Sequence, residues 1–236
     1  MLKIENTDVY GWEAAIRGMR NPMNSWDKSD SKLKGPNKVP CCNCVCLRCD
    51  DAHYEIGSND LDLMKKLVSA GTDHSKFMRM IIVTCDITAP LYWWKEFDTY
   101  KVGTVRNSCS TMHKIHEKEF TLDDFSHEHL TLLHTSDFPL GQGESIDVLK
   151  NTIKFLNMYR EYYNRAVDTE WKKRYWWQII QLLPSSYNQR ATVQLNYQVL
   201  RNIYQARKNH KLDEWYTFCN WIEGLPYSDL ITGNKE

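Results

Sequence analysis

Residues 182–207 read LLPSSYNQRATVQLNYQVLRNIYQAR, and this stretch decides how the C-terminal half of the chain folds. Apolar residues recur at spacings of three and four after Pro184. That spacing is typical of one face of an α-helix, so it predicts a helix over 188–208. On such a helix Asn196 and Arg207 lie within about 20° of each other, whereas Asn202 points elsewhere. As chemistry alone, the three polar residues are also compatible with a solvated helix face.

The rest of the chain predicts an α+β fold, rich in helix and with a small central sheet. The same apolar spacing predicts further helices over 145–167, 169–183 and 212–223, and shorter ones over 59–71 and 90–101. Residues 77–87, FMRMIIVTCDI, are the one convincing strand, and a second short strand precedes a helix near the N-terminus. The helical C-terminal part therefore extends over 145–225.

The composition limits the classes of function. The 236 residues, 42% of them hydrophobic, suit one domain over 1–236. Lys and Arg together number 30, as do Asp and Glu, so no broad basic field is expected to hold nucleic acid. No run approaches the roughly 18 apolar residues of a membrane helix, and the N-terminus lacks the pattern of a signal peptide. We expect a cytoplasmic protein with no nucleic-acid or membrane partner.

Residues 21–58 are predicted to form an irregular excursion that contains five of the eight cysteines. Two CxxC pairs lie within it, Cys41 with Cys44 and Cys46 with Cys49, and thiolates at that spacing are candidate zinc ligands. Structural zinc sites join such pairs through a longer loop than the single residue found here, so free thiols in a surface loop are the alternative. Motifs of P-loop, dinucleotide-binding and nucleophile-elbow proteins are absent from the sequence.

Residues 101–114, KVGTVRNSCSTMHK, gather small polar side chains behind a glycine. Backbone N–H groups and hydroxyls at such short spacing can surround an anion, so this stretch is a candidate site for a nucleotide phosphate. A solvated turn is the alternative.

The stretch that opened this section resembles the C-terminal signature of the flavin-dependent thymidylate synthases, the ThyX family. In that signature an Asn follows a Leu-Pro by twelve residues and opens a helix that ends in a substrate-binding Arg. Here Asn196 follows Pro184 by twelve residues, Asn202 comes six later, and Arg207 comes eleven after Asn196. The register holds without a gap.

A second resemblance lies upstream and extends the similarity over roughly residues 70–215. Residues 73–97, DHSKFMRMIIVTCDITAPLYWWKEF, are similar to the family's strand and helix entry, which leads to its RHRxxSxNExSxRY motif. In the stretch 101–114, Asn107 and Ser110 match the Asn and the second Ser of that motif.

The resemblance implies a ThyX-like α+β domain, a homotetramer, and the flavin-dependent methylation of dUMP to dTMP. Methylenetetrahydrofolate would be the carbon donor, FAD the hydride carrier and NADPH the reductant. By the same resemblance Ser110 is the catalytic candidate, and Arg207, Ser110 and Glu96 would bind the substrate. The cofactor-binding candidates are Asn107, Lys101, Asn196, Asn202 and His74.

The match is divergent, because most of the family's arginines are replaced. The positions concerned read Thr99-Tyr100-Lys101 for the RHR triplet, Met112, Gln198 and Ile180. Each lost Arg removes a charge-assisted hydrogen bond worth about 1.5 to 3 kcal/mol. Arg106, Lys114 and Arg190 are possible substitutes. The alternative function is a catalytically inactive protein of the same fold that binds or sequesters a nucleotide or a nucleotide-like signal.

Overall fold

A computed structural model describes residues 2–34, 53–130 and 145–233 of the chain. Its centre is a four-stranded sheet in the order β1-β4-β6-β5, with every neighbouring pair antiparallel. The strands are β1 (Lys3–Tyr10), β4 (Ile82–Pro90), β5 (Val105–Ser108) and β6 (Asn188–Asn196). The two central strands pair along their whole length, from Ile82 opposite Asn196 to Pro90 opposite Asn188. The predicted α+β fold with a small central sheet is confirmed.

Strand β6 corrects the prediction of one helix over 188–208. Gln189, Ala191, Val193 and Leu195 are buried, and the residues between them are exposed, which is the period-2 pattern of a strand with one solvated face. The helix α6 begins only at Tyr197 and runs to Arg207. Asn196 therefore stands at the junction, as the last residue of β6 and the N-cap of α6.

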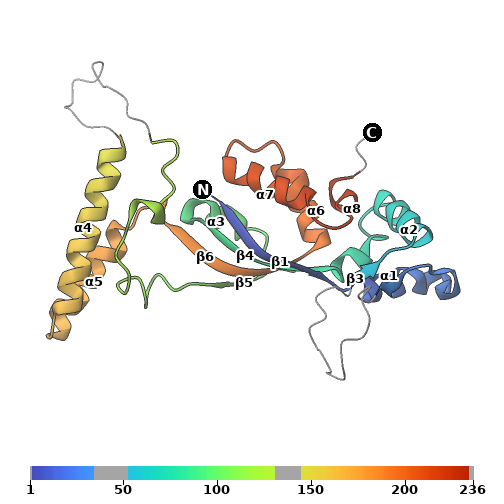
Figure 1. Ribbon diagram of the computed structural model, residues 1–236, viewed down its shortest axis with the longest axis horizontal. Coiled ribbons are helices and arrows are strands. Elements are labelled where there is room, and N and C mark those ends of the chain that lie inside the picture. The colour runs from blue at the N-terminus through green and yellow to red at the C-terminus, as the bar shows by residue number, and fades with distance from the viewer. Residues whose placement is uncertain (1, 35–52, 131–144, 234–236) are drawn as a thin grey trace, which may run out of the picture.

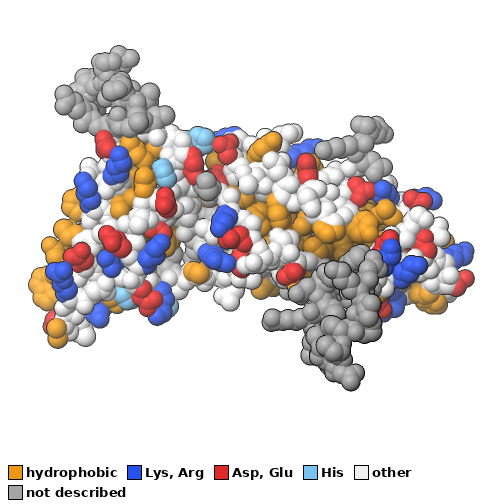
Figure 2. All heavy atoms as spheres, in the orientation of Figure 1, with side chains coloured by type: hydrophobic (Ala, Val, Ile, Leu, Met, Phe, Trp, Pro, Cys, Tyr) orange, Lys and Arg blue, Asp and Glu red, His pale blue; other side chains and the backbone are white. Residues whose placement is uncertain are grey.

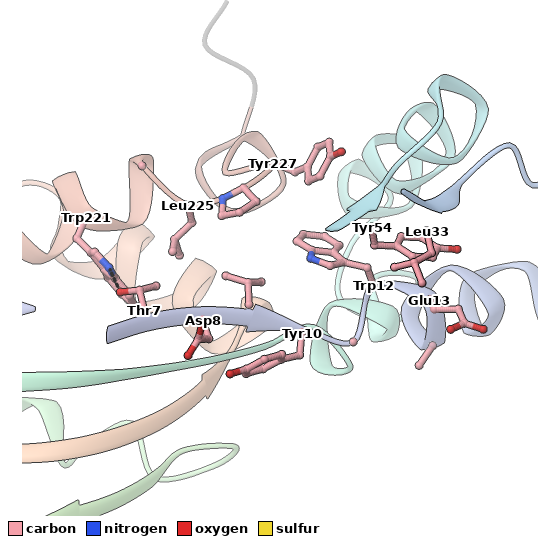
Figure 3. A pocket seen from close by; sticks show the side chains of 15 residues that line it. Thr7, Asp8, Tyr10, Trp12, Glu13, Leu33, Tyr54, Trp221, Leu225 and Tyr227 are labelled. Atoms are coloured by element: carbon pink, nitrogen blue, oxygen red, sulfur yellow. Dashed lines mark hydrogen bonds between the residues drawn. The ribbon is translucent and has the colours of Figure 1, made fainter. Parts of the chain in front are cut away.

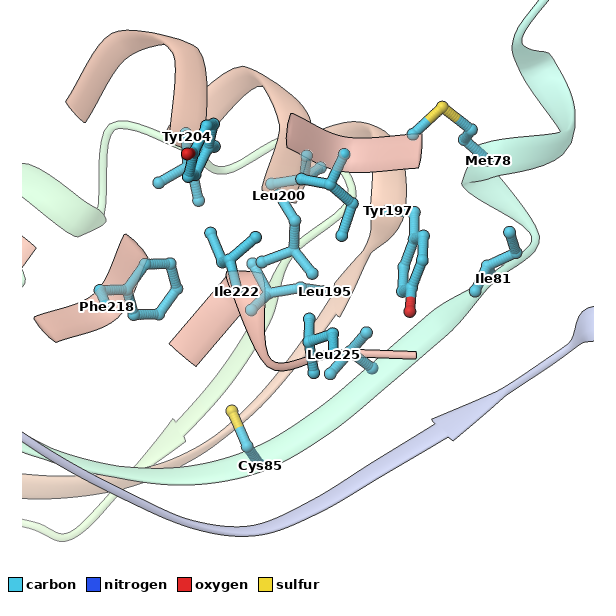
Figure 4. Packing of buried hydrophobic residues seen from close by; sticks show 14 of the residues in the cluster. Met78, Ile81, Cys85, Leu195, Tyr197, Leu200, Tyr204, Phe218, Ile222 and Leu225 are labelled. Atoms are coloured by element: carbon cyan, nitrogen blue, oxygen red, sulfur yellow. The ribbon is translucent and has the colours of Figure 1, made fainter. Parts of the chain in front are cut away.

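Four helices cover one face of the sheet (Figure 1). These are α3 (Leu91–Phe97), α6, α7 (Asp213–Glu223) and α8 (Asp229–Thr232). Side chains of α6 and α7, among them Leu200 and Ile222, pack over Leu195 and Cys85 of the sheet (Figure 4). Burial of these apolar groups contributes on the order of 25 cal/mol per Å² removed from water, and it fixes where the ends of α3, α6 and α7 meet.

The helices α4 (Ser145–Arg165) and α5 (Thr169–Leu182) form a hairpin at one end of the molecule (Figure 1). They match the predicted helices 145–167 and 169–183 to within two residues. The Asp168 carboxylate caps α5 by accepting the N–H groups of Glu170 and Trp171. Leu156 and Ile179 lie in a separate apolar cluster that holds the hairpin together.

The opposite end carries α1 (Trp12–Arg20), α2 (Ser58–Ser69) and a two-stranded ribbon of β2 (Lys32–Lys34) and β3 (His53–Glu55). Short 3-10 turns lie at Asn21–Met23, Trp26–Lys28, Lys76–Arg79 and Leu122–Asp124. The described flanks of the predicted excursion 21–58 are thus partly regular. The zinc candidates Cys41, Cys44, Cys46 and Cys49 lie outside the described residues. In the described part of the chain, no helix is both long and apolar enough to cross a membrane.

Candidate functional site

Arg207, the last residue of α6, lies where three helices meet. Its Nη1 donates to the Glu96 carboxylate of α3 at 2.9 Å, and its Nε donates to the Tyr100 hydroxyl at 2.9 Å. The guanidinium carbon is 4.8 Å from the centre of the Trp215 ring of α7 and 5.7 Å from that of Tyr100. A planar cation between two aromatic rings and a carboxylate is held in one orientation.

Glu96 completes this arrangement from the other side. Its Oε2 also accepts the Trp215 indole N–H at 2.8 Å, and the His210 Nε2 lies 3.5 Å away. The Arg207 side chain keeps 19% of its surface exposed and Glu96 keeps 34%, so a small molecule can reach both. We call Arg207, Glu96, Tyr100, Trp215 and His210 the Arg207 cluster. It presents both a hydrogen-bond donor and an acceptor, which suits the edge of a heterocyclic base.

Asn196 performs a structural task at the start of α6. Its carboxamide oxygen accepts the Val199 N–H at 3.0 Å, and the residue is 8% exposed. Gly103 lies directly against it with a φ of 79°, and a Cβ built there would come within 2.7 Å of the Asn196 Nδ2. The loop before β5 is therefore fitted closely to the start of α6.

Asn202 belongs to a short hydrogen-bonded chain on α6. Its Oδ1 accepts from the Gln198 amide at 3.0 Å, and the Gln198 Oε1 accepts from the Ser75 hydroxyl at 3.2 Å. His74 precedes Ser75 in an exposed turn. These hydrogen bonds link Asn202 to Ser75, the residue after His74, although the two lie far apart in the sequence.

Ser110 lies in the turn that follows β5. Its hydroxyl oxygen accepts the N–H groups of Met112 at 3.2 Å and of His113 at 3.0 Å, so its own proton remains available to donate. Asn107 lies on the edge strand β5, opposite Thr192. Lys101 and Asn107 are exposed and make no side-chain hydrogen bond or ion pair among the described residues.

Within one chain, the predicted residues fall into two separate groups. Arg207 contacts α3 and α7, whereas the Ser110 turn rests on the α4–α5 hairpin, where the Trp176 indole donates to the Met112 carbonyl at 2.9 Å. Among the described residues, the Ser110 and Arg207 side chains have no hydrogen-bonding partner in common. In the sequence, Gly103 lies between Tyr100 and Ser110, and Asn196 lies between Ser110 and Arg207.

The possible substitutes for the missing arginines are all paired with carboxylates. Arg106 donates to Asp98 at 2.7 Å and stacks over Trp94, Arg190 donates to Asp86 at 2.7 Å, and Lys114 pairs with Glu117. Hydrogen bonds from Thr192, Arg190 and Asn6 hold the pKa of Asp86 well below its ordinary value, so this carboxylate stays ionised. Lys101, which was predicted to bind the cofactor, has no carboxylate partner in the described part of the chain.

Three members of the Arg207 cluster were not selected as functional from the sequence: Tyr100, His210 and Trp215. Trp215 on α7 and His210 in the connection between α6 and α7 belong to no motif, and only the tertiary packing of this region places them beside Glu96. No group of three or more metal-binding side chains occurs among the residues that the structure describes.

Of the comparisons with known proteins, the one with solved structures finds a similar fold. No family model and no curated protein matches the sequence. Two structures of thymidylate synthase X from Helicobacter pylori, both in complex with FAD and dUMP, are similar to this chain with a TM-score of 0.60. They are 14% and 15% identical to it, and each match covers 98% of this chain and 97% of theirs. The chain therefore has a ThyX-like fold along nearly its whole length.

Proposed function

We propose that this chain binds a pyrimidine nucleotide, with dUMP as the first candidate, at a site that includes the Arg207 cluster. The observation that carries this proposal is the fixed orientation of Arg207. Its guanidinium is held by Glu96 and Tyr100 and lies over Trp215, at the position where the ThyX signature has its substrate-binding Arg. A prearranged donor of this kind binds a base edge without the entropic cost of ordering a flexible side chain.

The reaction that we propose for the bound nucleotide is flavin-dependent methylation of dUMP to dTMP. FAD would supply the hydride, with methylenetetrahydrofolate and NADPH as co-substrates. Lys101, Asn107 and His74 have exposed side chains that would hold FAD, and Asn202 would add an amide to them. Ser110 would donate its hydroxyl proton to the pyrimidine or its phosphate, because its oxygen already accepts two N–H groups.

This proposal needs more than one copy of the chain. In a single copy the Ser110 turn rests on the α4–α5 hairpin through the hydrogen bond from Trp176 to the Met112 carbonyl, whereas Arg207 contacts α3 and α7, and among the described residues the two share no hydrogen-bonding partner. A homotetramer, as the resemblance implies, would bring the Ser110 turn of one copy to the Arg207 cluster of another. We propose that the complete site lies between subunits.

A second candidate function is nucleotide binding without turnover. The observation that favours it is the pairing of Arg106, Arg190 and Lys114 with Asp98, Asp86 and Glu117. An arginine neutralised by its own carboxylate contributes less to binding the phosphates of FAD. Both candidates require the Arg207 cluster, so they differ in the cofactor and not in the nucleotide.

Nucleotide binding is tested by melting the purified protein with and without dUMP, dCMP or inorganic phosphate. A ligand at 100 times its Kd stabilises the folded protein by about 2.7 kcal/mol, which raises the Tm by roughly 5 to 10 °C for a chain of this size. We expect this shift with dUMP and not with phosphate alone. The proposal fails if millimolar dUMP leaves the Tm unchanged.

The two candidates are separated by the cofactor. Protein that purifies with a visible flavin absorption band, and converts dUMP to dTMP with methylenetetrahydrofolate and NADPH, is the enzyme. Protein that responds to dUMP but takes up no added FAD, measured by the flavin retained after gel filtration, is the binding protein.

A further inference from the structure

A large pocket lies away from all the residues considered so far. Its volume is about 1170 Å³, and it is lined by β1, the start of α1, β2, β3 and the segment that follows α7. None of the predicted site residues that the structure describes contributes to it. Such a volume exceeds the roughly 300 to 1,000 Å³ of most small-molecule pockets.

The pocket follows the outer edge of β1. Side chains of a strand alternate between its two faces, so a pocket on one face would be lined by every second residue. This pocket is lined instead by four consecutive residues of the strand, Thr7 to Tyr10, and the lining continues into the start of α1 as far as Ala14. It therefore lies along the edge of the strand, where backbone N–H and C=O groups point outward. In the described part of the chain, β1 pairs with β4 alone, and its other edge has no strand partner.

The two sides of this edge differ in chemistry (Figure 3). Trp221, Leu225 and Tyr227 lie on one side of β1 and provide an apolar wall. The Trp221 indole donates to the Thr7 hydroxyl at 3.1 Å, which fixes the ring beside the strand. The side chains of Asp8 and Tyr10 lie on the other side.

The charged residues of the lining are all acidic. They are Asp8 on β1 and Glu13 in the first turn of α1, both exposed, and no Lys, Arg or His among the described residues lines the pocket. Glu13 lies 3.7 Å from Arg17 in an exposed i,i+4 pair, so Asp8 is the carboxylate without a basic partner in the described part of the chain. A segment added to β1 would turn alternate side chains toward the apolar wall and toward Asp8. The sequence of a segment that fits this edge therefore alternates apolar with basic residues. Its apolar side chains would be buried against the aromatic rings of the wall, and its basic side chains would face the Asp8 carboxylate.

We propose that the outer edge of β1 binds an extended segment of another protein, which adds to the sheet as a further strand and alternates apolar with basic side chains. Backbone hydrogen bonds to β1 supply affinity, and the Trp221 wall and Asp8 supply the preference for sequence. This site is independent of the nucleotide site proposed above, since the two share no residue.

The test uses the full chain and three fluorescein-labelled octapeptides. The first alternates Val with Lys, the second alternates Val with Glu, and the third is the Val-Lys peptide with Pro at one central Val. Fluorescence anisotropy should show the Val-Lys peptide binding at least about tenfold more tightly than either of the others. Hydrogen exchange should slow at those residues among 7–10 whose amides point away from β4 when the Val-Lys peptide is added, because these amides become bonded.

Charge variants test the role of the carboxylates. The double variant Asp8→Asn, Glu13→Gln should lose most of the preference for Lys over Glu, whereas Asp147→Asn, Glu161→Gln on α4 should keep it. Equal affinity for the Lys and Glu peptides, or protection confined to residues outside 7–10, would overturn the proposal. Protection of residues 7–10 that rises with protein concentration and needs no peptide would also overturn it, since a second copy would then occupy the edge.

Discussion

Arg207 and Glu96 form a hydrogen-bonded ion pair of 2.9 Å between the end of α6 and α3. The pair is partly exposed, so screening limits its contribution to the free energy of unfolding to about 1 kcal/mol or less. The pair matters because it orients the Arg207 side chain. Together with the Trp215 and Tyr100 rings, the Glu96 carboxylate holds the guanidinium in one orientation. A nucleotide that binds here finds its partner already in place.

Replacing Arg207 by Ala should abolish the Tm shift caused by dUMP, and replacing it by Lys should reduce the shift to about half at the same dUMP concentration. Lys keeps the charge but cannot offer the planar, forked donor of Arg, so it should bind dUMP about tenfold or more weakly. Thermal melting with a dUMP titration measures this. Arg165→Ala, at an exposed i,i+4 pair with Glu161 on α4, is the matched control and should leave the shift intact. A full dUMP response from Arg207→Ala would remove the Arg207 cluster from the site.

Asn196 allows a structural role to be separated from a role in cofactor binding. It caps α6 through the Val199 N–H, so Asn196→Ala should cost about 1 kcal/mol of unfolding free energy, and Asn196→Ser should cost less because Ser also caps helices. If Asn196 also contacts FAD, Asn196→Ser will lose flavin while keeping its urea midpoint. Retention of flavin by a normally stable Asn196→Ser variant would confine the residue to capping.

The region around Asn196 also explains why the prediction of one helix over 188–208 was wrong. The alternation of Ala191, Val193 and Leu195 was visible in the sequence, but Val193, Tyr197, Leu200 and Tyr204 also fit spacings of three and four. Both periods run through the junction at Asn196, so the helix pattern masked the strand before it. The helices α2, α4, α5 and α7 lie outside this region, and their bounds agree with the predicted ones to within two residues.

The site was harder to predict than the fold. Pro184, Asn196 and Arg207 could be matched by spacing along the chain. Of the partners of Arg207, Glu96 was among the predicted residues, but Trp215 was not, since it lies 119 residues from Glu96 and meets it only through helix packing. Edge strand β5 was also missed, because four residues with mostly exposed side chains carry no apolar alternation.

Gly103 provides a test of the close fit between the β5 loop and α6. Gly103→Ala forces a side chain into a left-handed φ, at about 1 to 2 kcal/mol, and places its Cβ against Asn196. Gly71→Ala is the matched control, because Gly71 has a φ of 107° and nothing within 4 Å of its added Cβ. Urea denaturation should show Gly103→Ala to be the less stable variant. Equal losses would mean that the loop moves away from Asn196 at no cost.

Cysteine reactivity reports on the Ser110 turn. Burial, followed by the charge of Asp86, raises the pKa of Cys85 to about 12, and burial with Glu223 raises that of Cys219 to about 11. Cys109 is exposed beside Ser110. Iodoacetamide at pH 8, followed by peptide mass spectrometry, should therefore modify Cys109 and spare the other two until the protein unfolds.

Nucleotide binding should slow that modification of Cys109. A ligand phosphate held at the Ser110 turn would cover the neighbouring thiol, so dUMP should protect it and deoxyuridine, which lacks the phosphate, should protect it less. Unchanged labelling in the presence of saturating dUMP would place the phosphate elsewhere.

The buried ion pair of Asp60 and Arg20 anchors the segment between α1 and α2. The Arg20 Nε donates to Asp60 at 2.6 Å, and the hydroxyls of Ser29 and Ser31 donate to the same carboxylate at 2.7 and 2.6 Å. Burial alone would raise the pKa of Asp60, but the hydrogen bonds from Ser31, Ser29 and Arg20 outweigh it, and the pKa is lowered. Asp60→Asn leaves Arg20 as an uncompensated buried charge and should cost about 3 to 5 kcal/mol at pH 7.

The pH dependence follows from the direction of that shift. Because the folded pKa of Asp60 lies below the unfolded value of about 3.9, the ionised carboxylate stabilises the protein fully above that value. The stabilisation is lost as the pH falls through the folded pKa. Urea midpoints of the wild type and Asp60→Asn should therefore converge as the pH falls below about 4 and stay a constant interval apart between pH 5 and 7. Ser31→Ala, which removes one donor and keeps the ion pair, should show the same convergence with a smaller interval. An interval that is independent of pH down to 2 would show that the Asp60 carboxylate contributes the same stability in both ionisation states.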